Sequence, residues 1–308
     1  MMVSLRNSNG GCEVVKITDM TSCTFEQALT VWNKGFEGYF SNMTMTMDKF
    51  IARFGHEGLS PELSIVAWDG DTPIGFIVSG IRNVRGKVIA WNGGTGVVPA
   101  YRGRGVGQRM MQFCLDMYRR HGVDIAYLEA VVENESAIAL YERVGYRIID
   151  RVAMVHRMGA LNDDAFLSTD ASRYTTVTGL PQELANLEFY QAFSPWQAQW
   201  PSVTGGKSII LYDAADSPMA YALYKHWLND PGEIVSMALY QCEARPDVLD
   251  KEGIIQKLVR EVYSPLAVDC RRLTVNVRTS NETLMNLLRT EGFTTHFEQL
   301  FMGLDLTR

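Results

Sequence analysis

The first half of the chain shows two hydrophobic periods. Alternation of apolar and polar residues at 13–18 predicts a short strand, and short, largely apolar segments predict further strands at 64–68, 74–81, 87–98, 125–132 and 146–156. Segments with apolar residues three and four positions apart predict amphipathic helices at 25–36, 47–54, 106–121 and 136–144. Because helices and strands are interspersed, the pattern predicts an α/β fold class with the order β-α-α-β-β-β-α-β-α-β.

The stretch 159–172 lacks strong periodicity and is rich in small and acidic residues. It predicts a linker, and a length of 308 residues is typical of two domains. After the linker, apolar patterning predicts strands at 208–212, 219–227, 233–240 and 273–277 and a helix at 250–263. We therefore expect a first domain at 1–160, a linker at 161–172 and a second domain at 173–308.

One internal repeat supports this division. Residues 134–146 (NESAIALYERVGY) align without gaps to residues 281–293 (NETLMNLLRTEGF), and each segment follows one predicted strand and precedes another. Chance similarity between two helix ends is the alternative explanation. The shared Asn, Glu, Leu, Gly and terminal aromatic residue favour duplication of a whole domain.

Composition and charge narrow the classes of function. The formal net charge of −6 argues against a general nucleic-acid binder, which needs a basic surface. No apolar run approaches the roughly 20 residues that cross a bilayer, and the first residues lack the apolar core of a signal peptide. Five cysteines without a CxxC pair, and no HExxH sequence, predict neither a disulfide framework nor a metal site. We expect a cytoplasmic protein without membrane or nucleic-acid partners.

The segment 95–109 (TGVVPAYRGRGVGQR) has the composition of an anion site. A predicted strand ends at about Val98, a glycine-rich turn follows, and a helix begins near Val106. Free N–H groups at a helix start bind anions, and glycines let a phosphate approach the backbone. Three arginines add positive charge here: Arg102, Arg104 and Arg109.

Three other interpretations of this segment fit less well. The P-loop sequence GxxxxGK[ST] is absent, and the dinucleotide fingerprint GxGxxG has Gln108 where its third glycine belongs. A simple tight turn does not explain why glycines and arginines cluster at a helix start.

The pattern Arg102-x-x-Gly105-x-Gly107, preceded by Val97-x-Pro99, resembles the acyl-CoA pyrophosphate motif of the GNAT superfamily of N-acyltransferases. Downstream, the chain is similar to the second half of the same signature at Leu128-Glu129, Asn134, Ala137, Leu140-Tyr141 and Gly145-Tyr146. The resemblance covers roughly 13–158. It implies a mixed, mainly antiparallel sheet flanked by helices, and acetyl-CoA as co-substrate.

The resemblance also implies roles for individual residues in binding acetyl-CoA. Val97 is expected to hydrogen-bond the pantetheine arm, and Asn134 to line it. The remaining cofactor-binding residues belong to the glycine-rich turn and the helix start: Arg102, Gly103, Arg104, Gly105, Val106, Gly107 and Gln108. Independently, glycines inside a strand mark a bulge or the close approach of a ligand, and 87–98 contains three of them.

Transfer to an amine needs a base for the amine proton and an acid for the leaving thiolate. Tyr141, at the family's tyrosine position, is the expected acid; its alternative is a core aromatic. Glu129 lies 12 positions earlier, a spacing that resembles ribosomal-protein N-terminal acetyltransferases, and is the expected base, directly or through a water. Alternatively, Glu129 is a solvent-exposed strand residue without a catalytic role. Glu133 is a weaker candidate base.

The acceptor and the second domain are less clear from the sequence. Phe36, Tyr39, Phe40 and Met43 lie where the family walls the acceptor site, although ordinary packing explains them equally well. The second half has CEARPDVLDKE at 242–252 instead of the glycine-rich turn, Leu288 instead of the tyrosine and Asn276 instead of Glu129. It resembles a GNAT-like domain that has lost its cofactor site.

The sequence thus predicts an N-acetyltransferase that moves an acetyl group from acetyl-CoA to a primary amine by direct attack in a ternary complex. The acceptor is a small molecule or a peptide, the chain is a monomer or homodimer, and no metal is needed. A CoA-binding sensor or scaffold without turnover, and a protein N-terminal acetyltransferase, are the alternatives.

Overall fold

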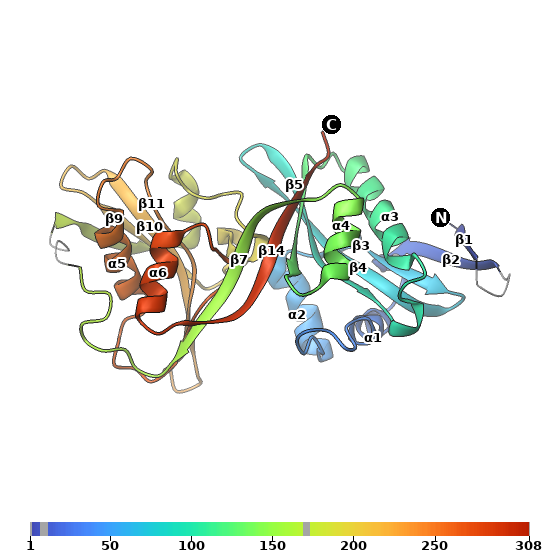
Figure 1. Ribbon diagram of the computed structural model, residues 1–308, viewed down its shortest axis with the longest axis horizontal. Coiled ribbons are helices and arrows are strands. Elements are labelled where there is room, and N and C mark those ends of the chain that lie inside the picture. Colours follow the sequence, from blue (N-terminus) through green and yellow to red (C-terminus); the bar gives the residue numbers. More distant parts are fainter. Residues whose placement is uncertain (1, 7–11, 169–172, 308) are drawn as a thin grey trace. The chain divides into compact units, whose positions relative to one another are not determined.

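The computed structural model describes residues 2–6, 12–168 and 173–307. It forms two compact units: residues up to Ile149 together with those from Phe301 onward, and Asp150–Leu300 (Figure 1). Each unit has its own set of strands and its own buried hydrophobic residues.

From β2 (Cys12–Asp19) onward the first unit follows the predicted order, and β1 (Met2–Arg6), a strand that the sequence analysis did not predict, precedes it. The other strands of this unit are β3 (Ser60–Asp69), β4 (Thr72–Val84), β5 (Lys87–Val97), β6 (Ile125–Val131) and the last part of β14 (Thr294–Asp305). Its helices are α1 (Phe25–Gly35), α2 (Met47–Glu57), α3 (Val106–Arg120) and α4 (Glu135–Arg143). The β1 to β5 ladders are antiparallel, whereas β5 and β6 are parallel.

Local sequence explains the helices that flank this sheet. Thr24 and Gln27 form a reciprocal capping box at the start of α1. Gly58 ends α2 in the left-handed conformation, with φ 65°. On α3 the predicted apolar face is buried: Met110, Met111, Cys114, Leu115 and Tyr118.

A β-bulge interrupts β5 at Gly93. The β4–β5 register passes from Ser79–Asn92 to Val78–Gly94 and skips Gly93. The parallel ladder with β6 ends at the Asn92–Leu128 pair, although both strands continue. The prediction that glycines mark a bulge in this strand is confirmed. Beyond the bulge β5 and β6 no longer pair, and we call this unpaired stretch of the two strands the gap.

The second unit repeats this architecture. Its strands are β8 (Thr175–Gly179), β9 (Lys207–Tyr212), β10 (Pro218–Leu228), β11 (Ile234–Ala244), β12 (Arg271–Thr274), β13 (Val277–Arg278), most of β7 (Arg147–Met158) and the first part of β14. Its helices are α5 (Lys251–Val262) and α6 (Glu282–Thr290). The sheet order is β8-β9-β10-β11-β12-β7, and β11–β12 is the parallel pair.

The domain limits predicted from the sequence need correction. β7 pairs with β12 and β13, so the second unit begins at Asp150 instead of 173. The C-terminal part of β14 belongs in turn to the first unit, where the N–H of Leu306 donates to Asp124 O at 2.8 Å. Each unit therefore contains a strand segment from the far side of the expected boundary.

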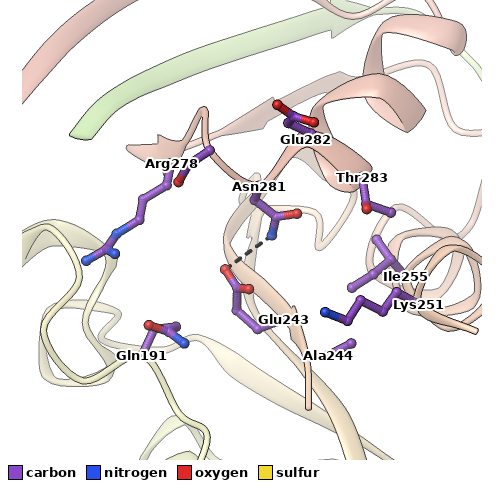
Figure 2. Close-up of a pocket in the computed structure, with 10 residues that line it drawn as sticks. Gln191, Glu243, Ala244, Lys251, Ile255, Arg278, Asn281, Glu282 and Thr283 are labelled. Carbon is purple, nitrogen blue, oxygen red and sulfur yellow. Dashed lines mark hydrogen bonds between the residues drawn. The ribbon is translucent and has the colours of Figure 1, made fainter. Parts of the chain in front are cut away.

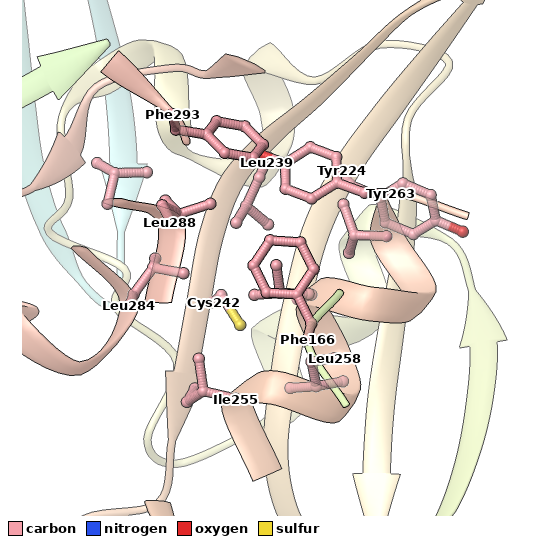
Figure 3. Close-up of a cluster of buried hydrophobic side chains, with 14 of the residues drawn as sticks. Phe166, Tyr224, Leu239, Cys242, Ile255, Leu258, Tyr263, Leu284, Leu288 and Phe293 are labelled. Atoms are coloured by element: carbon pink, nitrogen blue, oxygen red, sulfur yellow. The ribbon is translucent and has the colours of Figure 1, made fainter. Parts of the chain in front are cut away.

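Three residues of the predicted linker 161–172 are part of a core. Leu161, Ala165 and Phe166 are buried in the second unit, and the Phe166 ring stacks on Tyr263 at 6.2 Å between centroids. Figure 3 shows Phe166 among side chains from α5 and α6. The sequence analysis missed these buried apolar residues because their neighbours are small or acidic. Residues 169–172 lie outside the described residues.

The two units share equivalent details at a constant spacing of 147 residues. The β10–β11 register skips Tyr240, as β4–β5 skips Gly93, 147 positions earlier. Asn134 and Asn281, the same distance apart, each cap a helix by accepting from an N–H three residues later, both at 3.2 Å. A matching bulge and a matching cap support duplication of the whole domain.

Within the described ranges, no helix is both long and apolar enough to span a membrane.

Candidate active site

The start of α3 presents open backbone N–H groups. Its N-cap is Gly105, with φ 80° and no side-chain cap, and the first helical bond runs from Arg109 N–H to Gly105 O at 3.2 Å. The N–H groups of 106–108 therefore have no partner within the helix. A Cβ at Gly103 (φ 74°) or at Gly105 would meet nothing within 4 Å, so the face above these groups is open. Such an arrangement fits an anionic phosphate.

Gly107 has a different role from the two preceding glycines. A Cβ there would lie 3.2 Å from Leu140 Cδ2 on α4 and 3.9 Å from Val97 Cγ2. The absence of a side chain lets α3 approach α4 closely. Val106 is buried and Gln108 is exposed, so the N–H of Val106, and not its side chain, is available to a ligand.

The arginines of the loop differ in their contacts. Arg102 donates to Val97 O (2.9 Å), Gly35 O (3.0 Å) and Glu37 O (2.8 Å), and so ties the loop to β5 and to the end of α1. Arg104 places its guanidinium 5.6 Å from the Tyr101 ring centre and is exposed.

Val97 presents its backbone to the gap beyond the bulge. The neighbouring Val98 N–H donates to Ile74 O at 2.9 Å. Because backbone groups alternate in direction along an antiparallel strand, those of Val97 point away from β4. Its carbonyl accepts from Arg102, and its N–H faces the side on which the ladder with β6 has ended.

Tyr141 lies at this gap. Its side chain is only 7% exposed, and burial raises the pKa of its phenol to about 12, opposed by a hydrogen bond with Thr95 and reinforced by Tyr39 and Cys114. The phenol therefore keeps its proton at neutral pH, which is what a proton donor requires. Thr95 follows the bulge on β5 and was not anticipated from the sequence.

The α1–α2 segment reaches the same place. Tyr39 hydrogen-bonds the side chain of Asn134, the cap of α4, and burial raises the pKa of Tyr39. Tyr39 also packs on Phe36 and Phe40, with ring centres 5.0 and 5.4 Å apart, and Phe40 is 56% exposed. Three of the residues expected to wall the acceptor site, Phe36, Tyr39 and Phe40, therefore pack together, and Tyr39 contacts Asn134 at the start of α4.

Glu129 lies on the other face of the sheet. Its Oε2 accepts from Trp91 Nε1 at 2.7 Å, across the parallel β5–β6 pair. Asn92 contacts Met111 of α3, so strand alternation places Trp91 and Glu129 on the opposite face, toward α1 and α2. Trp91 orients the carboxylate, a role that no sequence motif indicated.

Side chains from both faces of the sheet make hydrogen bonds at or beside the bulge. Arg53 of α2 donates to the carbonyl of Gly93 at 2.6 Å and to Glu57 at 2.6 Å, with its guanidinium 4.7 Å from the Trp32 ring centre. On the α3 side, Asn92 Nδ2 donates a hydrogen bond to Thr95 Oγ1 at 2.8 Å. Tyr141 and Glu129 thus flank one gap from opposite sides. Among the described residues, no group of three His, Cys, Asp or Glu side chains is placed to hold a metal ion.

The second unit differs at each corresponding position. Asp250 caps α5 by accepting from Gly253 N–H at 3.0 Å, so its own carboxylate occupies the helix start. Leu288 is fully buried in the core. Strand pairing corrects the expectation for Asn276: Thr274 pairs with Leu239, so Val275 corresponds to Glu129, and Asn276 is an additional residue with φ 50°.

Comparisons with known proteins agree with this geometry. The family model of the Acetyltransferase (GNAT) family matches residues 26–146. N-alpha-acetyltransferase 30 of Schizosaccharomyces pombe is 32% identical over 115 residues, which cover 37% of this chain and 71% of that protein. A GCN5-related N-acetyltransferase from Sphaerobacter thermophilus superposes with a TM-score of 0.63 at 14% identity, covering 95% of this chain and 96% of that one. A tandem GNAT protein from the clavulanic acid biosynthesis pathway gives 0.59 at 14% identity, covering 95% and 98%.

An acyltransferase is therefore the class of enzyme that the fold and the family match define. The chain belongs to the GNAT family of acetyltransferases, which use acetyl-CoA. The structural matches extend over both units, so the fold is two GNAT-like domains in tandem.

Proposed function

We propose that the first unit transfers an acetyl group from acetyl-CoA to a primary amine at the gap beyond the Gly93 bulge. The observation that carries this proposal is an uncapped, glycine-lined helix start beside a gap flanked by a protonated tyrosine and a glutamate. The second unit has no such combination among its described residues, and we propose that it has lost the cofactor site.

The backbone does most of the donor binding in this proposal. The N–H groups of Gly103 to Gln108 hold the pyrophosphate, and the N–H of Val97 holds the pantetheine arm. Asn134 keeps the start of α4 in place beside that arm. Arg102 braces the loop through three carbonyls, and Arg104 and Arg109 supply positive charge.

The side chains on the two faces of the sheet have different roles in proton transfer. Acetyl-CoA supplies the acetyl thioester. Glu129 Oε1 or Oε2 accepts the proton of the attacking amine, directly or through a water, while Trp91 fixes the carboxylate. The Tyr141 hydroxyl gives its proton to the leaving sulfur. Glu133 is exposed and remains the weaker candidate base.

A peptide N-terminus is the second candidate acceptor beside a small-molecule amine. The name of the similar Schizosaccharomyces pombe protein favours it, as does the 12-residue spacing of Glu129 and Tyr141. Turnover assays with acetyl-CoA against peptides, polyamines, aminoglycosides and amino acids separate these acceptors. A protein that binds acetyl-CoA but releases no thiol with any of them would be the sensor or scaffold instead.

The donor site is tested by Gly105→Glu, with Gly86→Glu as matched control. A Cβ at either glycine would meet open space, and the two φ values are similar, 80° and 78°, so both variants carry the same backbone strain. Only Gly105→Glu adds a negative charge where the pyrophosphate binds. We expect calorimetry to show loss of acetyl-CoA binding in Gly105→Glu alone; equal affinities in the two folded variants would refute the placement.

A further inference from the structure

The second unit contains a cavity of about 450 Å³, a size usual for small-molecule sites. It lies where β11 ends and where α5 and α6 begin (Figure 2). Its lining includes Gln191, Glu243, Lys251, Ile255, Arg278 and Asn281.

The cavity corresponds to the proposed donor site of the first unit. Glu243 follows the Tyr240 bulge by three residues, as Gly96 follows Gly93. Asn281 is the counterpart of Asn134. Duplication thus left a cleft in the second unit at the place where the first unit faces its donor.

Two contacts make this cleft unsuitable for acetyl-CoA. The carboxylate of Asp250 occupies the helix start that would hold a pyrophosphate. Asn281 Nδ2 donates to Cys242 O at 3.0 Å and to Glu243 Oε1 at 3.2 Å, which ties the start of α6 to β11 at the position where we propose that the first unit holds the pantetheine arm. The remaining space suits a shorter ligand.

Lys251 and Arg278 bring two positive charges to the cavity lining. Lys251 makes no hydrogen bond or ion pair with any described residue, and Figure 2 shows its ammonium end directed into the pocket. Arg278 donates to Phe193 O at 2.9 Å from the other side. Glu282 is exposed and its carboxylate points away from the centre.

Of the two carboxyl groups that line the cavity, Glu243 is the more buried. Burial raises its pKa to about 7, against the opposing effects of the hydrogen bond from Asn281 and the charges of Arg278 and Lys251. Below that pH the group is neutral and donates a hydrogen bond; above it, the group is an anion that repels another anion.

We propose that this cavity binds a small carboxylate-bearing molecule, whose carboxylate lies between Lys251 and Arg278 and whose apolar part packs on Ile255. The Asn281 and Gln191 side chains border the same space. The proposal does not depend on catalysis in the first unit. Because an anionic ligand favours neutral Glu243, its affinity falls as the pH rises through about 7.

The test uses the full chain and matched pairs of probes: N-acetylglycine with N-acetylglycinamide, and benzoate with benzamide. Ligand-observed NMR at pH 6 and pH 8 is expected to show binding of the acids, weaker at pH 8, and none of the neutral amides. Lys251→Gln should weaken binding about tenfold or more, whereas Lys257→Gln, the same change on α5 at an ion pair with Glu261, should not. Glu243→Gln should bind with no pH dependence.

Four results would overturn the proposal. They are equal binding of acids and amides, unchanged affinity in Lys251→Gln, tighter binding of inorganic phosphate than of either acid, and loss of binding in Gly105→Glu, which alters only the first unit.

Discussion

Replacement of Tyr141 by Phe removes one oxygen atom at the gap and tests the proposed acid. A general acid contributes about 10²–10⁴-fold to the rate, which corresponds to about 2.7–5.4 kcal/mol of the barrier at 1.36 kcal/mol per decade. The lost hydrogen bond with Thr95 should cost stability only about 1 kcal/mol. We therefore expect kcat to fall at least a hundredfold in a protein that is still folded.

The matched control is Tyr146→Phe. Tyr146 is completely buried, its ring centre is 6.1 Å from that of Tyr141, and its hydroxyl has no hydrogen-bond partner among the described residues. Removal of an unpaired buried hydroxyl should leave stability equal or slightly higher, and kcat unchanged.

Steady-state thiol release measures kcat for Tyr141→Phe and Tyr146→Phe, and calorimetry measures their affinities for acetyl-CoA. Tyr141→Phe should lower kcat with little change in acetyl-CoA affinity. Because the Tyr141 phenol loses its proton only at about pH 12, the wild type should show no basic limb from this group below about pH 10. Equal kcat values for the two variants would refute the assignment of the acid.

Three further predictions follow from particular contacts. Glu129→Gln should remove the acidic limb of the kcat/KM profile for the amine, and an unchanged limb would assign the base to Glu133 or to a water chain. Glu243→Gln should stabilise the fold at pH 8 but not at pH 4, because the carboxyl group has a pKa of about 7 in the folded protein and near 4.5 in the unfolded chain. Thermal melts at both pH values measure this difference. An equal change of Tm at pH 4 and pH 8 would contradict the burial of Glu243. Asn281→Ala should destabilise the second unit by about 1 kcal/mol or more in urea, since it removes the α6 cap and two bonds to β11; an unchanged midpoint would contradict that role.

The regular elements were predictable because their signals are local. Helix and strand periods located the main elements of the chain from β2 to β7, and the glycines of 87–98 indicated the bulge. The pairing of strands depends on contacts distant in sequence. Nothing local in 294–305 shows that β14 leaves the second unit and ends beside Asp124, so the domain limits were wrong.

The candidate site was predictable only in part for the same reason. The resemblance located Tyr141, Glu129 and the glycine-rich turn, but not their surroundings. Thr95 and Trp91 act through partners 46 and 38 positions away, and no motif marks them. Arg102 looked like a phosphate ligand in the sequence, whereas the structure engages its guanidinium with three backbone carbonyls.

We propose that only one of the two units keeps the donor site. The most direct test of this proposal is the stoichiometry of acetyl-CoA binding to the full chain, measured by isothermal titration with the wild type and with Gly105→Glu. We expect one equivalent per chain for the wild type and none for the variant, because Asp250 occupies the second helix start. Two equivalents, or one that survives in Gly105→Glu, would contradict the proposal.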